Sequence, residues 1–411
     1  MTDPMSTKSA PQSPAQELGA PVRGQSAPSL RSLNLSLSDL RDSRSLRTAT
    51  VLLLLWLGLA AHPETRDAFL SASNLSNVTA QVAEIVIMGV GMTFVILIGG
   101  IDLSVGAGMA LFGVIAAQLQ IDHHQPAAVA IVAALLVSLV VGAWHGLLVA
   151  RFKVPPFVAT LSGFLAYRGL ALVLSDARGL SPMGSDFAAL GGRLSPGTSV
   201  AVCVTGLIAG VTLLVQQERR RRKFSLPAQS PLALGAVMLA MGLMVAVLIA
   251  IYREGMPVPV LIAATVTAFG ALLLRRSRLG RYAFAIGGNV EAARLSGVPV
   301  GRVTLFIYLI MAVLTALAGL VATARTNGVT PGNMGLIREL HVITAVVIGG
   351  TSLSGGRATM LGTLLGALIF GTLSNGMNLL NVNSNWQLIL TGAILLGASM
   401  LDSLSSRKGA S

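Results

Sequence analysis

The stretch IGGIDLSVG, residues Ile98–Gly106, recurs 250 residues later as IGGTSLSGG, residues Ile348–Gly356, with six of nine positions identical. Two adjacent glycines weaken a helix by about 1 kcal/mol each relative to alanine. Asp102 and Ser352 follow the two glycine pairs at the same spacing, and both are residue types that cap the start of a helix. Each copy therefore predicts a helix that stops, is capped and restarts.

The chain around these two breaks is strongly apolar. Of its 411 residues, 53% are hydrophobic and 11% are charged, whereas soluble domains carry about 25% charged residues. A membrane-crossing helix needs about 20 mainly apolar residues, because it rises about 1.5 Å per residue through about 30 Å of hydrocarbon. Apolar runs of this kind, some of them shorter, occur at residues 48–62, 78–98, 103–119, 126–150, 154–174, 199–215, 231–251, 256–274, 303–324, 341–350, 359–373 and 385–400.

A chain in lipid must satisfy its backbone hydrogen bonds internally, and a break is tolerated only where it is packed in protein or lines a water-filled cavity. The sequence therefore predicts an all-α fold, a polytopic transmembrane helical bundle of about 10–12 membrane segments with interrupted or short helices. We expect the bundle over residues 48–403. Residues 1–47, rich in Ser and Pro, are expected to form a disordered cytoplasmic tail, and residues 404–411 a second cytoplasmic tail.

The net charge of +13 is unevenly distributed. With the N-terminus in the cytoplasm, the inner loops hold 22 of the 29 Lys and Arg residues, and the outer loops hold six. This is the positive-inside pattern of membrane proteins, so the basic residues indicate orientation in lipid and not nucleic-acid binding. Two inner loops are long: residues 216–230, expected to be a solvated basic turn, and residues 275–302.

Interrupted helices in matching positions are typical of transporters, where they lie near the substrate path. The alternative is that both copies are tight packing elements of small residues. The predicted topology places the two copies on segments that run in the same direction, as a parallel repeat.

Polar residues inside the apolar runs are candidates for that path. Ionisable groups within a membrane indicate function by default, and Glu84 is expected on a helix face turned to the bundle interior, together with Gln81, Met88 and Gly91. The other polar groups are mainly neutral, which fits a hydroxyl-rich solute better than an ion. The candidate substrate-path residues are Glu84, Asp102, Ser104, Tyr167, Ser352, Asn375 and Asn378.

The chain has no G-x-x-x-x-G-K-[ST] stretch, so it cannot bind a nucleotide in the P-loop manner. A transporter without its own energy source needs a partner. The inner loop 275–302 holds Gly287-Gly288-Asn289, predicted to form a turn, and then VEAARLSG, predicted to form a short helix ending at Gly297. This helix would either lie among lipid headgroups or dock a soluble partner.

The segment EAARLSG, Glu291–Gly297, resembles the coupling motif of ABC importer permeases, a short helix that sits in a groove of the ATPase subunit. Over residues 75–403 the chain resembles the sugar-type ABC permease family of ribose and xylose importers, and the matching stretches are GMTFVILIGGIDLSVG, GRYAFAIGGNVEAARLSGV, VIGGTSLSGG and SNGMNLL. The apolar pair over residues 199–251 resembles the extra hairpin of the xylose type.

The resemblance implies a permease of the bacterial inner membrane that pairs with a second permease copy as a homodimer. A cytoplasmic ABC ATPase would use ATP and Mg, and a periplasmic sugar-binding protein would deliver the solute. The permease itself would be no enzyme and would hold no cofactor or metal. The residues that the resemblance assigns to ATPase coupling are Gly287, Gly288, Asn289, Glu291, Ala292, Ala293 and Gly297.

The resemblance makes D-xylose or a related pentose the expected solute. Two positions depart from the family pattern: His341 replaces an acidic residue, and Glu84 replaces a neutral one. Three alternatives remain. The chain could be a stand-alone secondary sugar symporter, a non-transporting membrane scaffold or sensor, or an ABC permease for ribose, another sugar or an amino acid.

Overall fold

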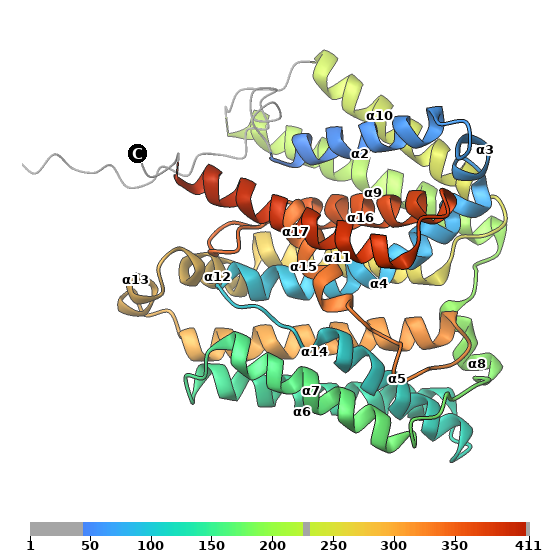
Figure 1. Ribbon diagram of the computed structural model, residues 1–411. Coiled ribbons are helices and arrows are strands. Elements are labelled where there is room, and N and C mark those ends of the chain that lie inside the picture. The colour runs from blue at the N-terminus through green and yellow to red at the C-terminus, as the bar shows by residue number, and fades with distance from the viewer. Residues whose placement is uncertain (1–43, 225–230, 408–411) are drawn as a thin grey trace, which may run out of the picture. The chain divides into compact units, whose positions relative to one another are not determined.

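The computed structural model describes residues 44–224 and 231–407, which form helices and their connections (Figure 1). The predicted N-terminal tail lies outside the described residues except at its end, where the first described helix begins at Arg44. Residues 408–411 of the predicted C-terminal tail also lie outside them. Within the described ranges, the only β-structure consists of two isolated bridges, Leu180 with Val329 and Arg193 with Pro257.

All twelve predicted apolar runs are helical, which confirms the all-α membrane bundle. These helices are α2 (Arg44–Ala61), α4 (Ala72–Leu97), α5 (Val105–Ile121), α6 (Ala127–Ala150), α7 (Pro156–Leu174), α9 (Pro196–Lys223), α10 (Pro231–Ile251), α11 (Val258–Arg276), α14 (Val300–Arg325), α15 (Arg338–Ile348), α16 (Met360–Leu379) and α17 (Ser384–Arg407). Eight of them are long and apolar enough to cross a membrane, namely α4, α6, α7, α9, α10, α11, α14 and α16. Short helices connect them: α3 (Arg66–Phe69), α8 (Ser185–Ala188), η1 (Ala189–Gly191), α12 (Arg278–Gly288) and α13 (Val290–Leu295).

Helix α4 is the central element of the bundle. Of its 18 most apolar consecutive residues, 94% are buried. Helices α11, α14 and α16 pack along α4. Neighbouring helices, and not lipid, therefore cover most of α4. The apolar side chains between Ile85 and Leu97 belong to the same large core cluster.

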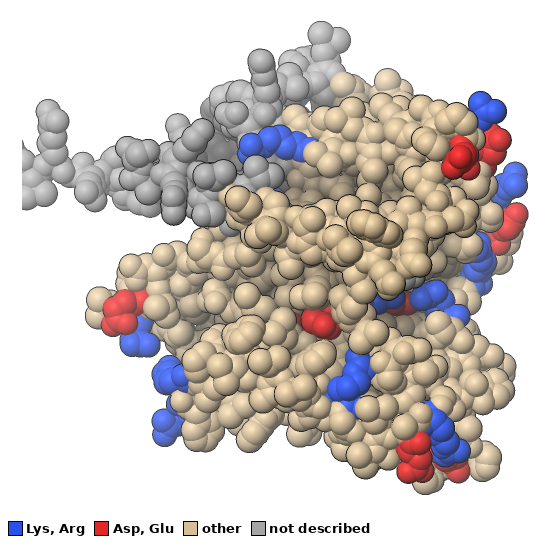
Figure 2. Space-filling view, viewed as in Figure 1, with Lys and Arg blue, Asp and Glu red and all other residues tan. Residues whose placement is uncertain are grey.

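The connections lie at two opposite ends of the helices. Figure 1 shows α12 and α13 at one end, here called the α13 end, and α3 and α8 at the other, here called the α8 end. In the view of Figure 2, most charged side chains lie at these two ends, and the surface between them is mainly uncharged. This is the distribution expected of helices that cross a hydrocarbon layer.

The two helices before the breaks, α4 and α15, run in the same direction. Arg338, at the start of α15, lies 3.5 Å from Glu84 of α4, and Gly356, beyond the end of α15, donates a backbone hydrogen bond to Leu97 at the end of α4. The two copies are therefore arranged in parallel, as predicted. Both helices point from the α8 end toward the α13 end.

Small residues let α6 and α14 approach closely. Gly142 and Gly146 lie four residues apart on one face of α6, and a Cβ atom added at Gly142 would lie 2.9 Å from both Leu309 Cα and Tyr308 O of α14. At Gly146 an added Cβ would lie 2.9 Å from Leu305 Cα. This is the small-xxx-small packing by which membrane helices bring their backbones together.

Two predictions were wrong in detail. Residues 216–223 of the predicted basic turn continue helix α9, because Gln, Glu, Arg and Lys are strong helix formers and cations are favourable at a helix C-terminus. Arg222 also pairs with Glu218 one turn earlier at 3.3 Å. Four residues of α4 were predicted to face the bundle interior. Glu84, Met88 and Gly91 are buried as predicted, but Gln81 is exposed.

Candidate functional site: two helix breaks and the α12–α13 segment

The first break follows α4 directly. Gly99 has φ +80°, a left-handed conformation that glycine adopts without strain, and α5 restarts at Val105. Asp102 is 3% exposed, and its Oδ1 accepts hydrogen bonds from Ser104 N at 2.9 Å and Ser104 Oγ at 2.6 Å. The prediction that Asp102 caps α5 was therefore wrong. Asp102 stabilises a turn two residues ahead, and Ser104 occupies the N-cap position with no side-chain cap bond.

Three side chains from α6, α7 and α14 surround this break. Tyr167 Oη lies 3.1 Å from His145 Nε2, and the rings of His145 and Tyr308 are 6.2 Å apart, edge to face. His145 and Tyr308 are 2% and 1% exposed, and a Cβ atom added at Gly100, within the break, would lie 3.2 Å from Tyr308 Oη. Thr160 of α7 donates to Ile101 O at 3.1 Å. The first break is therefore packed in protein.

The structure thus brings together Asp102, Ser104 and Tyr167 of the predicted substrate path. Sequence reasoning missed His145 and Tyr308. The signal for His145 was present, because an ionisable side chain inside an apolar run is a functional candidate by default. No sequence signal distinguishes Tyr308 from other interior aromatic residues.

The second break follows α15. Gly350 has φ +91°, and α16 restarts at Met360, where the Thr359 hydroxyl accepts from Gly362 N at 2.9 Å. Ser352 is buried but is not the cap of α16. Its backbone N donates to Arg357 O at 3.0 Å, and its hydroxyl lies 2.9 Å from Ser354 Oγ. The prediction for Ser352 was wrong because the loop after this break is longer than the first, which leaves Thr359 to cap the helix.

The α12–α13 segment at the α13 end begins differently from the prediction. Gly287 and Gly288 do not form a turn but complete the last turn of α12. Asn289 ends that helix and caps the next, since its Oδ1 accepts from Glu291 N at 3.0 Å and Ala292 N at 2.9 Å. These are the bonds of a strong N-cap.

The predicted short helix itself is confirmed as α13. Gly297 follows this helix with φ +80°. Gly297 N donates to Arg294 O and Val298 N donates to Ala293 O, each at 3.0 Å, and these two bonds form a Schellman C-cap. Of this helix only Ala293 is buried. Leu295 is 82% exposed, and Glu291 forms an exposed ion pair with Arg294 at 3.2 Å.

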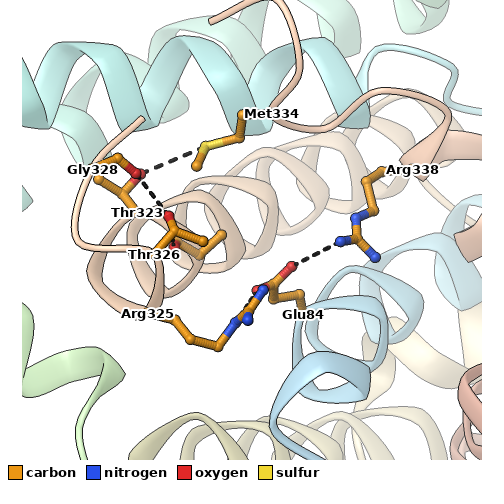
Figure 3. A network of polar contacts seen from close by, with 8 residues as sticks. Glu84, Thr323, Arg325, Thr326, Gly328, Met334 and Arg338 are labelled. Atoms are coloured by element: carbon orange, nitrogen blue, oxygen red, sulfur yellow. Dashed lines mark hydrogen bonds and ion pairs between the residues drawn. The ribbon is translucent and has the colours of Figure 1, made fainter. Parts of the chain in front are cut away.

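Glu84 lies at the centre of a charged cluster near the α8 end (Figure 3). Its Oε1 accepts from Arg325 Nε at 2.9 Å, and its Oε2 lies 3.5 Å from a terminal nitrogen of Arg338. The Glu84 side chain is 1% exposed, whereas the two arginines are about a quarter exposed. The cluster therefore joins α4, the end of α14 and the start of α15.

Asn375 and Asn378 lie away from the first break. Asn375 exchanges two side-chain hydrogen bonds with Asn74, at 2.9 and 3.1 Å, and Asn378 accepts from Gln387 at 2.8 Å. Asn74 lies at the start of α4 and Asp102 beyond its end, and a 26-residue helix is about 39 Å long. These amides therefore connect helices at the α8 end. His341, the other departure from the family pattern, stacks on Phe370 with ring centroids 4.5 Å apart.

A bundle of this kind, with two interrupted helices and an exposed helix on one face, is the architecture of a membrane permease. The chain belongs to the family of permease components of branched-chain amino acid transport systems, whose model matches residues 74–399. It is 39% identical to the xylose transport system permease protein of Escherichia coli over 84% of this chain and 88% of that protein.

Other relatives carry related names. The xylose transport system permease protein of Haemophilus influenzae is 39% identical over 84% of this chain and 92% of its own length. The ribose import permease protein of Bacillus subtilis is 36% identical over 82% of this chain and 86% of its own. No solved structure matches the chain.

Proposed function

We propose that this chain is the membrane-spanning permease subunit of an ATP-driven ABC importer for a monosaccharide, D-xylose or a related pentose. The observation that carries the proposal is the 39% identity to xylose permeases, which extends over 84% of the chain and 88% of the relative. The family match over residues 74–399 includes both helix breaks and the α12–α13 segment. The chain itself would bind no nucleotide.

The α13 end would face the cytoplasm of a bacterium, with the chain in the inner membrane and its N-terminus inside. The segments at this end carry most of the described Lys and Arg residues, including Arg151, Lys153 and the run Arg219–Lys223. The positive-inside rule supports this orientation. The α8 end would then face the periplasm and receive solute from a sugar-binding protein.

Helix α13 would dock the cytoplasmic ATPase. An exposed leucine is ordinary by itself, but α13 is a complete, capped helix that presents nearly all its side chains outward. Such an unpartnered helix fits into the groove of another protein. ATP and Mg would be used in the partner, and a second permease copy would complete the importer. The ATPase cycle would switch the path between outward-open and inward-open states.

Reconstitution tests the proposal. The permease, its ATPase and its sugar-binding protein, taken from the same organism, are placed in liposomes and assayed with labelled pentoses and hexoses. We expect ATP-dependent uptake of D-xylose or a related pentose. Uptake by the purified permease alone, driven by an ion gradient, would instead identify a secondary symporter. Uptake restricted to ribose would favour the second candidate, which the 36% identity to a ribose permease supports.

Replacing Leu295 by aspartate should weaken the complex with the ATPase by about tenfold or more, since an apolar contact residue in a docking helix contributes about 1–2 kcal/mol. Leu295 is 82% exposed and makes no core contact, so the permease should still insert and fold. The measurement is the amount of ATPase that co-purifies with the permease. The matched control is Leu336→Asp, because Leu336 is also exposed, at 55%, but lies near the α8 end. Equal loss in both variants would show that α13 is not the docking element.

A further inference from the structure

Three backbone segments from distant parts of the chain meet at the α13 end. Gly356, in the loop after the second break, donates its N–H to Leu97 O, just before the first break, at 3.0 Å. Gly287, in the last turn of α12, lies against both: a Cβ atom at Gly287 would overlap Leu97 O and lie 2.5 Å from Gly356 N. The two breaks and the α12–α13 segment therefore share one contact, here called the glycine junction (Leu97, Gly287 and Gly356).

The junction is close-packed on each of its sides. A Cβ atom at Gly355 would lie 3.0 Å from Leu97 O and 3.1 Å from Gly287 O, and one at Gly356 would lie 3.1 Å from Gly287 O. Gly355 and Gly356 also have φ of +83° and +74°, which disfavour any other residue. By contrast, a Cβ atom at the neighbouring Gly288 would meet nothing within 4 Å. The tight fit is thus specific to one of the two adjacent glycines of α12.

Helix α12 connects α13 to this junction. Its first turn is capped by Ser277, whose hydroxyl accepts from Gly280 N at 3.1 Å, and its last turn ends at Asn289. Asn289 is also the cap of α13, so a single residue joins the two helices. The buried side chains of α12, Ala283 and Ile286, hold it on the core. A shift of α13 must therefore move the α12 turn that contains Gly287.

We propose that the glycine junction makes the two helix breaks move together, with Gly287 as the positioning residue that transmits the movement of α13 to both. This rests on the proposed function, in which an ATPase moves α13. Packed contacts between backbones have few intermediate arrangements, since a small shift at one face breaks or remakes the whole fit. The end of α4 and the loop after α15 would then switch as one unit.

Gly287→Ala in the complete importer tests the junction. The added methyl separates α12 from Leu97 and Gly356, so we expect pentose uptake to fall about tenfold or more. The ratio of ATP hydrolysis with and without solute-loaded binding protein should fall with it, while the ATPase still co-purifies. The control is Gly301→Ala at the same end of the bundle, where an added Cβ meets only Ala150, at 4.0 Å. It should retain uptake within about twofold.

Two results would overturn the proposal: normal uptake in Gly287→Ala, or loss of the ATPase from the Gly287→Ala complex. The second would indicate a change in the docking surface. Failure of the wild-type importer to take up any pentose would instead refute the proposed function. These outcomes are distinct because the wild type and Gly301→Ala are measured in the same assay.

Hydrogen exchange gives an independent test that needs no variant. The Gly356 amide is predicted to be protected, because it donates to Leu97 O. When a nucleotide analogue closes the ATPase in the wild-type complex, residues 96–100 and 353–358 should change protection together. A change in one segment without the other would contradict a shared junction, even if the Gly287→Ala protein did not fold.

Discussion

Replacing Glu84 by glutamine is expected to lower the free energy of unfolding by about 2–3 kcal/mol, since removing one partner of a buried charge cluster leaves the other charges uncompensated. The carboxylate is 1% exposed and is shared between Arg325 at 2.9 Å and Arg338 at 3.5 Å. The loss should stay below that of a wholly buried pair, because both arginines are about a quarter exposed and can regain water. The stability of the purified permease in detergent, followed by denaturant titration, measures it.

The matched control is Asp122→Asn. Asp122 pairs with Arg178 at 2.8 Å, as close as the Glu84 pair, but the Arg178 side chain is 56% exposed. An exposed pair of this kind contributes about 0.2–1 kcal/mol. The double variant Glu84→Gln with Arg325→Gln should be less destabilised than the sum of the single variants. Equal effects at Glu84 and Asp122, or additive effects within the cluster, would show that the cluster does not hold α4, α14 and α15 together.

Gly142→Leu should be the most disruptive single change among the helix contacts described. A Cβ atom at this position already lies 2.9 Å from backbone atoms of Tyr308 and Leu309, which cannot rotate away as a side chain can. Helix α6 must therefore separate from α14. We expect a loss of more than about 3 kcal/mol in the free energy of unfolding, since overpacking and lost interhelical contact add.

Gly169→Leu on α7 controls for the cost of a large side chain on a membrane helix. A Cβ atom at Gly169 meets nothing within 4 Å, and the residue is exposed. Leucine there faces lipid and should leave stability unchanged or raise it slightly, because leucine is the better helix former. Folded yield after size-exclusion chromatography and the denaturation midpoint measure both variants. A Gly142→Leu protein as stable as Gly169→Leu would refute the close approach of α6 and α14.

Much of the fold could be predicted because lipid imposes strong local rules. Apolar runs of sufficient length must be helices, so all twelve were found. The two glycine pairs correctly predicted the positions of both breaks, because the low helix propensity of glycine is a property of the residue itself and does not depend on distant contacts. The end of α13 at Gly297 was also predicted, because glycine favours helix C-termini whatever surrounds it. Asn289 was predicted only as part of a turn, and the structure shows it as the N-cap.

The rest could not be predicted because it depends on contacts between distant segments. Nothing near Glu84 in the sequence indicates Arg325 or Arg338 as its partners, which lie about 250 residues away. The caps at Asp102 and Ser352 were misplaced because residue type predicts a hydrogen bond but not how many residues the loop spans. The glycine junction could not be predicted from the sequence either, because it depends on contacts between distant segments. Gly287 and Gly288 look alike in the sequence, and only packing shows that one is confined and the other open.

Helices α9 and α10 stand apart from the core, with only 11% and 6% of their most apolar windows buried. The chain leaves and rejoins the bundle at one place, where Leu194 N donates to Met256 O and Val258 N to Gly192 O, both at 2.9 Å. Because the two ends of this hairpin are already neighbours, a gene could gain or lose the whole pair of spans in one recombination event without rerouting any other helix.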